Sequence, residues 1–249
     1  MLRWVVSPFR TMLAISVAGL ATWIAAWSVT FFAWRDDDSL RIEKVIDWWG
    51  RTILAGAGVS LAVTGLEHVD TGRSYVVVSN HQGALDIPAH FVAMPIPIRF
   101  LAKKELFGVP ILGTALRAIG IVEVDRQAGA TVHGQINAQS AEVMRRGDSI
   151  LVYAEGTRFR DGAVHEFKRG AFSIAIDSGL PILPVMVHGG HLVWPRRRPI
   201  FGGTMKVAIS APIETSGLTR RDVVMLRDQT RDMIEEMVTA AEAGEPGQS

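Results

Sequence analysis

A histidine and an aspartate, His81 and Asp86, stand five residues apart directly after the apolar run 75–78. Partners on one face of a helix lie three or four residues apart, so this spacing requires a turn, which Gly83 permits. A neutral imidazole accepts a proton from a hydroxyl near pH 7, while a carboxylate on its other nitrogen fixes the tautomer and stabilises the imidazolium. The pair therefore predicts activation of an alcohol nucleophile at the end of a strand.

A second polar segment follows another apolar run, 150–153, and begins with Glu155. In an open α/β sheet, the loops at the carboxyl ends of the strands line the ligand crevice, so the two segments can converge on one site. Cationic side chains add to them a positive charge suited to a phosphate. The residues of this second group are Glu155, Gly156, Thr157, Arg158, Lys103, Lys104, Arg126, Lys168 and Arg169.

Each of these residues also has an ordinary structural interpretation when it is taken alone. A single histidine such as His81 is more often a satisfied structural residue, and a single Asp86 is more often a surface or helix-start carboxylate. Glu155 and Arg158 can cap the turn or pair with each other. Only the combination favours a functional site, and of the two adjacent lysines we favour Lys104.

The body of the chain alternates apolar runs with helical patterns from about residue 58 to residue 243. This alternation is typical of an α/β domain with a mixed, mostly parallel central sheet flanked by helices. We expect strands at 60–64, 75–79, 98–102, 121–124, 150–153, 182–187 and 205–209. We expect helices after His81, over 130–146 and 170–178, and from about Thr219, with Asp222 completing a capping box. Residues 244–249 are predicted to form a disordered tail.

The first 57 residues are predicted to anchor the protein to a membrane. Residues 11–34 carry no charge, and as a helix they would reach roughly 36 Å, enough to cross a bilayer core. A cleaved signal peptide is the competing interpretation, but the stretch exceeds a typical signal-peptide core. Residues 40–57 place apolar and charged side chains at helical spacing, which indicates an amphipathic helix on the membrane.

The distribution of charge and the amino-acid composition indicate where the protein lies in the cell and exclude some kinds of partner. Arg3 and Arg10 precede the apolar stretch and more basic residues follow it, which places the catalytic body on the cytoplasmic side of an inner membrane. A shallow or re-entrant helix with both ends on that side satisfies the same charges. The chain has no cysteine, which excludes disulfides, thiol nucleophiles and thiolate metal sites. We expect no metal and no nucleic-acid partner.

Five motifs, in this order along the chain, resemble those of the glycerolipid acyltransferases. They are His81 with Asp86, then Lys103–Leu106, Val124–Arg126, Glu155–Arg158 and Pro181–Val185. The similarity covers residues 58–213 and is greatest to the bacterial lysophosphatidic acid acyltransferases. A lone His-x4-Asp occurs often by chance, whereas several motifs in the correct order do not. The chain departs from the common pattern at Ala154, where proline is usual, and at Val124, where isoleucine is usual.

The resemblance implies direct acyl transfer from a thioester, acyl-CoA or acyl carrier protein, to the sn-2 hydroxyl of lysophosphatidic acid. Phosphatidic acid would be the product, membrane lipids would surround the enzyme, and the acyl thioester would be a co-substrate with no further cofactor. His81 would take the hydroxyl proton, Asp86 would orient His81, and no acyl-enzyme would form. By the same likeness the acceptor would be bound by Glu155, Gly156, Thr157 and Arg158, with Lys104, Arg126 and Lys168 as helpers and Arg158 on the phosphate.

Three alternatives stay open. The same chemistry serves another acceptor, such as glycerol-3-phosphate, another lysophospholipid or a lyso-ornithine lipid. A membrane hydrolase would use His81 to activate water, although the chain lacks the Gly-x-Ser-x-Gly turn. A scaffold would bind lipid without turnover. An acyltransferase also requires an apolar channel for the acyl chain, for which we propose Phe91, Met94, Leu112 and Leu116.

Overall fold

The computed structural model of the protein describes residues 2–35, 39–125, 131–195 and 197–244. Its strands form one seven-stranded sheet in the order β1-β7-β6-β2-β5-β3-β4, in which the β6–β7 pair is antiparallel and the other pairs are parallel. The predicted mixed, mostly parallel sheet is confirmed. The strands are β1 (Val59–Thr64), β2 (Val76–Ser79), β3 (Ile98–Lys103), β4 (Val122–Val124), β5 (Ser149–Tyr153), β6 (Ile182–His188) and β7 (Gly203–Ile209).

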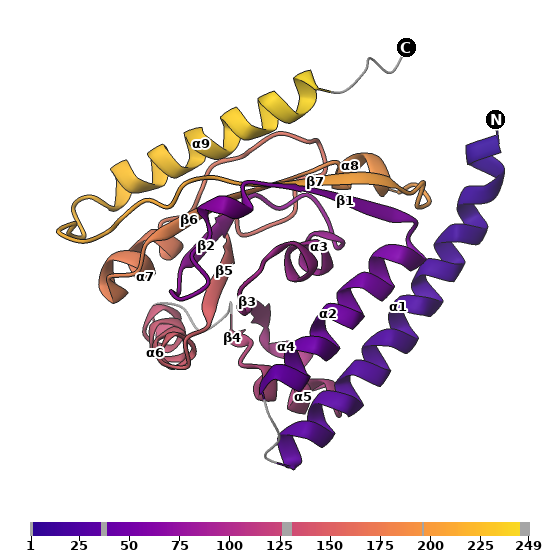
Figure 1. The fold of residues 1–249 in the computed structure, drawn as a ribbon, viewed down its shortest axis with the longest axis horizontal. Helices are drawn as coiled ribbons and strands as arrows, with labels where there is room; N and C mark the ends of the chain where they lie inside the picture. Colours follow the sequence, from indigo (N-terminus) through magenta and orange to yellow (C-terminus); the bar gives the residue numbers. More distant parts are fainter. Residues whose placement is uncertain (1, 36–38, 126–130, 196, 245–249) are drawn as a thin grey trace.

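Helices cover both faces of this sheet (Figure 1). They are α1 (Leu2–Trp34), α2 (Ser39–Gly56), α3 (Asp86–Ala93), α4 (Lys104–Phe107), α5 (Leu112–Ile119), α6 (Thr131–Arg145), α7 (Gly170–Ser178), α8 (Gly190–Val193) and α9 (Val223–Ala243), with a 3-10 turn, η1 (Leu66–His68). The core on one face joins α2 and α3 to the sheet, and the core on the other joins α7 and α9 to it. The sheet therefore lies between two helical layers.

The central strand β2 shows how the sequence positions the site. Its three valines, Val76–Val78, are completely buried, because a central parallel strand packs on both faces and reads as a continuous apolar run. Val77 belongs to the core under α3, while Val76 and Val78 belong to the core under α7 and α9. β2 pairs in register with β5, Ser79 opposite Tyr153, so the segments that leave the two strands emerge side by side.

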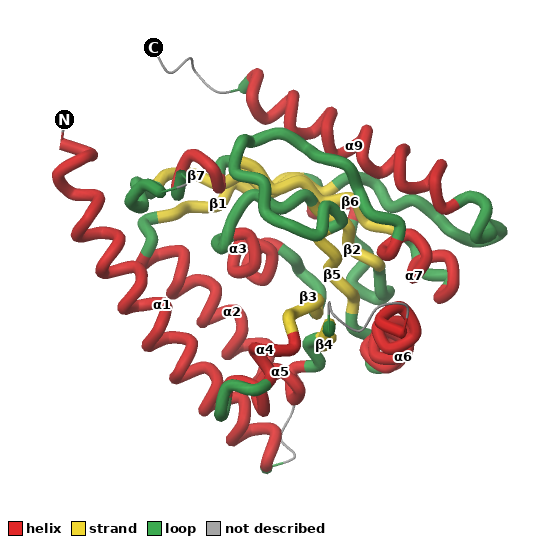
Figure 2. The backbone as a smooth tube through the Cα atoms, turned by 180° about the vertical axis from the view of Figure 1, so that it is seen from behind, coloured by secondary structure: helices red, strands yellow, loops and turns green. Residues whose placement is uncertain are grey.

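The helices α1 and α2 run side by side along one edge of the molecule (Figures 1 and 2). Trp49 Nε1 donates to Thr22 Oγ1 at 3.0 Å, and a Cβ at Gly56 would lie 2.8 Å from Val17. The helix segment Pro8–Trp34 is long and apolar enough to cross a membrane by length and composition. Its outward side chains are exposed and mostly apolar, including Met12, Leu13, Leu20, Trp23, Trp27 and Phe31.

Both the N-terminal and the C-terminal parts of α1 contact the polypeptide that follows α2. The backbone N–H of Ile200 donates to Thr11 Oγ1 at 2.7 Å, and the Arg10 guanidinium donates to the carbonyl of Phe201. Near its C-terminal end, α1 packs Ala26 and Val29 against Ala115 of α5. The long apolar helix is therefore packed against the α/β body along much of its length.

The predicted strands are confirmed within two residues at each end, whereas the helices differ in two respects. The short helices α4, α5 and α8 were not predicted, and α5 follows Ile111, whose φ of +66° is rare for a β-branched residue. The last helix begins at Val223, four residues later than predicted. Thr219 and Asp222 instead form a turn before it, in which the Asp222 carboxylate accepts from the backbone and hydroxyl of Thr219.

Candidate active site

The His81–Asp86 pair lies in the turn between β2 and α3. His81 Nδ1 is 2.7 Å from Asp86 Oδ2, and the same oxygen accepts the backbone N–H groups of Gln82 at 2.7 Å and Gly83 at 2.8 Å. Asp86 is completely buried, and His81 is 8% exposed. Since the carboxylate accepts a proton from Nδ1, the lone pair of His81 lies on Nε2, the nitrogen that a substrate hydroxyl must reach.

The loop after β5 brings Arg158 to that nitrogen. Arg158 Nε lies 3.1 Å from His81 Nε2 and donates to it. The backbone reinforces this contact, because the N–H of Phe159 donates to the carbonyl of His81 at 2.9 Å. A fixed positive charge therefore lies next to the lone pair of the histidine, as a site for an anionic substrate with a reactive hydroxyl would require.

Gly156 and Lys168 complete the loop. Gly156 has a φ of +71°, in the left-handed region that favours glycine, and a Cβ there would lie 2.6 Å from Lys168 Nζ. The backbone N–H of Lys168 donates to the carbonyl of Ala154 at 2.8 Å, which holds the lysine beside the loop. Thr157 is exposed on the same loop. The structure thus brings Arg158 to the histidine turn and Lys168 to Gly156 on the same loop, whereas Thr157 shares only the loop.

The other predicted cations are placed differently. Lys104 follows β3, which is separated from β2 by β5, and its ammonium lies 3.0 Å from Asp125 Oδ2. Lys104 lies at the same edge of the sheet as His81, but its ammonium pairs with Asp125, which directly follows β4. Arg126 lies outside the described residues, as do residues 245–249 of the tail predicted at 244–249.

Glu155 is buried beside the histidine turn, with 3% of its surface exposed. Its Oε1 accepts the backbone N–H of His165 at 3.3 Å, and its Oε2 has no hydrogen-bond partner among the described residues. Burial is the largest influence on this carboxyl and raises its pKa from 4.5 to about 7, although the His165 N–H favours the charged form. Glu155 therefore titrates near neutral pH.

Replacing Glu155 with glutamine should stabilise the protein at alkaline pH. A carboxyl whose pKa is raised by folding favours the folded state when protonated, and it costs stability as pH rises from 4.5 through 7. At about pH 8 the variant should gain about 3 kcal/mol in unfolding free energy, and near pH 4 the gain should vanish. Urea unfolding at both pH values measures this difference. Glu236→Gln, on the exposed face of α9, is the control, and an equal effect there would contradict the assignment.

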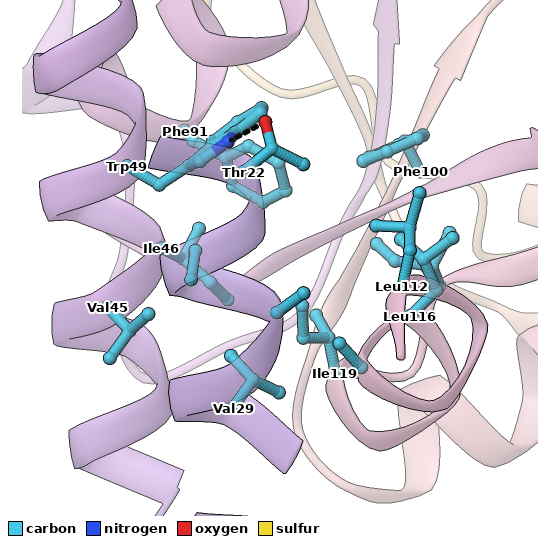
Figure 3. Close-up of a pocket in the computed structure, with 14 residues that line it drawn as sticks. Thr22, Val29, Val45, Ile46, Trp49, Phe91, Phe100, Leu112, Leu116 and Ile119 are labelled. Carbon is cyan, nitrogen blue, oxygen red and sulfur yellow. Dashed lines mark hydrogen bonds between the residues drawn. The ribbon is translucent and has the colours of Figure 1, made fainter. Parts of the chain in front are cut away.

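An apolar cavity of about 100 Å³ lies between α1, α2, α3, α5 and the sheet (Figure 3). Three of the four residues proposed for an acyl channel line it, namely Phe91, Leu112 and Leu116. Met94, the fourth, does not line this cavity and is instead buried in the core that joins α3 to the sheet. The sequence did not predict that α1 and α2 supply one wall, with side chains that include Thr22, Val29, Ile46 and Trp49.

Two aromatic residues that the sequence did not single out also contact the histidine turn. The ring of Tyr153 stacks on the ring of His81 with centroids 3.9 Å apart and an interplanar angle of 15°. His90, one turn along α3 from Asp86, packs edge-on against Tyr153 at 5.5 Å and 85°. Their only signal in the sequence is position, since Tyr153 is the last residue of a strand that precedes a predicted site segment.

The fold and the site together define an α/β protein with a histidine–aspartate pair beside an arginine, at the carboxyl edge of its sheet. Residues 60–188, more than half of the chain, match the model of the acyltransferase family. The chain belongs to this family.

Two relatives agree with this assignment. The human 1-acyl-sn-glycerol-3-phosphate acyltransferase alpha is 30% identical over 175 residues, which cover 70% of this chain and 62% of that protein. The 1-acyl-sn-glycerol-3-phosphate acyltransferase of Pseudomonas aeruginosa is 28% identical over 193 residues, covering 76% of this chain and 72% of that protein. The chain thus spans about six-tenths of the length of the human relative.

The crystal structure of the 1-acyl-sn-glycerophosphate acyltransferase, PlsC, from Thermotoga maritima has the same fold. It superposes with a TM-score of 0.83 and 24% sequence identity, and the match covers 98% of this chain and all of that chain. The match includes the N-terminal helices as well as the sheet, because it extends over nearly the whole chain. The helical pair α1–α2 is therefore part of the shared fold.

Proposed function

We propose that this protein transfers an acyl chain from an acyl thioester, acyl-CoA or acyl carrier protein, to the sn-2 hydroxyl of lysophosphatidic acid. The observation that carries the proposal is the 3.1 Å contact between Arg158 Nε and His81 Nε2. In lysophosphatidic acid the phosphate and the sn-2 hydroxyl are on adjacent carbons. A phosphate on Arg158 therefore brings that hydroxyl within reach of the base, and the names of the relatives support the same substrate.

In the proposed reaction His81 Nε2 accepts the hydroxyl proton as the oxygen attacks the thioester carbonyl. A C–O bond forms, the C–S bond breaks, and the departing thiolate takes the proton back from the imidazolium. The Asp86 carboxylate, held by two backbone N–H groups, stabilises the positive imidazolium between these steps. The thioester is the only co-substrate, and no covalent enzyme intermediate is needed.

Arg158 must release His81 before the reaction, because its N–H occupies the lone pair that the hydroxyl proton needs. A phosphate is a stronger acceptor for a guanidinium than a neutral imidazole nitrogen, since the hydrogen bond is then charged on both sides. Binding of the acceptor phosphate therefore exposes the base. In the free enzyme the same contact would keep water from taking the place of the acceptor hydroxyl at Nε2.

Replacing Arg158 with alanine should raise the KM for lysophosphatidic acid about 10- to 100-fold, the value of a hydrogen bond to a charged group. Hydrolysis of acyl-CoA without acceptor should also increase, because water then reaches Nε2. Steady-state kinetics and thiol release measure the two effects. The control is Arg160→Ala, because the Arg160 guanidinium lies over the Trp194 ring at 5.7 Å. An unchanged KM in Arg158→Ala would remove this residue from the acceptor site.

The apolar cavity is proposed to hold the transferred acyl chain. Helix α3 links it to the site, because Asp86 begins the helix and Phe91 lines the cavity, with its ring 5.8 Å from Phe100. A saturated chain fits such a lining, which is almost entirely apolar. The cavity is also next to the α1–α2 pair, whose outer face is exposed and apolar.

Replacing Ala115 with phenylalanine should shift the donor preference toward shorter chains. Ala115 is 2% exposed and lines the cavity, so a larger side chain occupies space that a long chain needs. We expect the rate with palmitoyl donor to fall about tenfold relative to decanoyl donor in a chain-length competition. Ala171→Ser, in the core on the opposite face of the sheet, is a control for general damage. An unchanged ratio would exclude this cavity.

The α1–α2 pair is proposed to hold the protein at the cytoplasmic face of the inner membrane. Of the two arrangements left open by the sequence, the packing favours a helix that enters one face only. Since α1 contacts the body through Thr11 near one end and α5 near the other, a fully crossing helix would draw these contacts into the bilayer. The division at residue 58 into anchor and catalytic domain stays a prediction.

The test is an acyl-transfer assay with purified full-length protein in phospholipid vesicles. Acyl-CoA and acyl carrier protein donors are each offered with lysophosphatidic acid, glycerol-3-phosphate, lysophosphatidylcholine and lyso-ornithine lipid. We expect the highest kcat/KM for lysophosphatidic acid, because among these acceptors it alone combines a terminal phosphate monoester next to the sn-2 hydroxyl with an acyl chain. Glycerol-3-phosphate also carries a phosphate next to its sn-2 hydroxyl. A preference for it would mean that the enzyme catalyses the first acylation, which yields lysophosphatidic acid, and not the second. Preference for an acceptor without a terminal phosphate would contradict the role of Arg158.

A further inference from the structure

Three groups touch the imidazole of His81, and each restrains it differently. Asp86 and Arg158 contact the two ring nitrogens in the ring plane, at 2.7 Å and 3.1 Å. Tyr153 covers one face of the ring, with centroids 3.9 Å apart and planes 15° from parallel. The first two contacts fix the direction of the nitrogens, whereas the stack fixes the tilt of the ring plane.

The stack becomes decisive when the acceptor binds. The proposed function, on which this step rests, requires Arg158 to leave Nε2. One hydrogen bond, from Nδ1 to Asp86, then remains in the ring plane, and a ring held by one hydrogen bond can pivot about it. A tilt of the plane moves the Nε2 lone pair away from the hydroxyl, and small misplacements of reacting groups cost large factors in rate.

The structure holds Tyr153 firmly enough to supply this restraint. The ring of His90 packs edge-on against Tyr153, with centroids 5.5 Å apart, and His90 Nδ1 lies 2.7 Å from the backbone carbonyl of Asp86. A carbonyl only accepts, so His90 carries its proton on Nδ1, while Ser79 Oγ lies 3.0 Å from Nε2. His90 is completely buried, and burial lowers its pKa, consistent with this neutral form.

The same helical turn thus controls both restraints. Asp86 orients His81 through its carboxylate, and its carbonyl holds His90, whose ring packs edge-on against the ring that stacks on His81. The parallel register of β2 and β5, with Ser79 opposite Tyr153, places the strand ends for this contact. Burial raises the pKa of Tyr153 well above its usual range, so the phenol stays protonated and takes no part as a base.

We infer that Tyr153 is a positioning residue for the general base, holding the plane of His81 by stacking while His90 holds Tyr153. Its essential feature is the aromatic face and not the hydroxyl. Phenylalanine should therefore replace it, and an aliphatic residue of similar burial should not.

The test compares Tyr153→Phe, Tyr153→Leu and Tyr75→Leu in the full chain. Tyr75 is the matched control, because it is the only other tyrosine, is 1% exposed, and its hydroxyl lies 3.0 Å from the N–H of Asp70, outside the site. We expect Tyr153→Leu to lower kcat about 10- to 100-fold with both KM values within about twofold. Tyr153→Phe should stay within about threefold of the unchanged protein, and Tyr75→Leu should lose thermal stability but not kcat.

A substrate-independent readout separates this inference from the proposed function. In protein labelled with ¹⁵N-histidine, the downfield Nδ1–H signal of His81 is identified by its loss in His81→Ala. It should persist in Tyr153→Phe and broaden by exchange in Tyr153→Leu, whatever the substrate is. A sharp His81 signal together with a kcat within threefold in Tyr153→Leu would overturn the inference. Equal losses of kcat in Tyr153→Leu and Tyr75→Leu would also overturn it, because the role would then be structural.

Discussion

Replacing His81 with alanine will lower kcat for acyl transfer by about 100- to 10,000-fold, the usual contribution of a positioned general base. The loss follows from the geometry, because Nε2 carries the lone pair and Asp86 holds the opposite nitrogen at 2.7 Å. KM for the acceptor should change little, since Arg158 remains available for the phosphate. Initial rates of phosphatidic acid formation measure the effect.

A histidine outside the site serves as the control for this substitution. His68 lies on the exposed turn η1, and its replacement by alanine should leave kcat unchanged. The melting temperature of His81→Ala should stay high enough for assay, because the Asp86 carboxylate keeps its two backbone N–H donors, Gln82 and Gly83, when the ring is removed. A His81→Ala protein that folds and turns over normally would exclude this residue as the base.

Asp86→Asn and Asp86→Ala should separate catalysis from stability. Asparagine keeps an oxygen that can accept from His81, Gln82 and Gly83 but loses the charge that stabilises the imidazolium, so kcat should fall about 100-fold with little unfolding. Alanine removes every acceptor at a completely buried site and leaves two backbone N–H groups without partners. It should therefore also lower the unfolding free energy, by about 2–5 kcal/mol.

Urea unfolding and steady-state kinetics on the same preparations measure both effects of the Asp86 variants. The matched control is Asp161→Asn, on an exposed carboxylate that pairs with His165 on the neighbouring loop. It should leave both quantities nearly unchanged. Equal kcat in Asp86→Asn and the unchanged protein would show that the charge of this carboxylate has no part in the reaction.

Much of the catalytic turn could be predicted because its determinants are local. The apolar run of β2, the spacing from His81 to Asp86 and the glycine between them lie within a dozen residues, and each acts through the backbone nearby. The proximity of His81 and Arg158 could be predicted less directly, because the loops that follow parallel strands lie at the same edge of the sheet. The structure places both where that argument puts them.

The stack of Tyr153 could not be predicted, because it depends on which strands are neighbours. The sequence indicates the existence of β2 and β5 but not that Ser79 pairs opposite Tyr153. The same holds for His90, whose place on α3 looks like an ordinary helical position. Pairing order is a long-range property that no single segment carries.

The sequence did not indicate which faces of α1 and α2 pack against the body, for a different reason. A helix apolar on all sides shows no preferred face, so residues such as Val29 looked the same as the exposed Trp27. Glu43 illustrates the reverse error. It is one of the charged residues in the predicted amphipathic segment 40–57, but its carboxylate pairs with Arg99 on β3, whose Nε also lies 3.1 Å from Asp148. Tertiary contacts, not periodicity, decide these orientations.

The most direct test of the central claim follows the fate of a labelled acyl chain. Purified protein is given ¹⁴C-labelled acyl-CoA, or the matching acyl carrier protein thioester, with lysophosphatidic acid in vesicles, and the products are separated and counted. The proposed function predicts that the label enters the sn-2 position of phosphatidic acid with one thiol released per ester formed, and that His81→Ala abolishes it. Label recovered only as free fatty acid would identify a hydrolase instead. No release of thiol from either donor would contradict acyl transfer altogether.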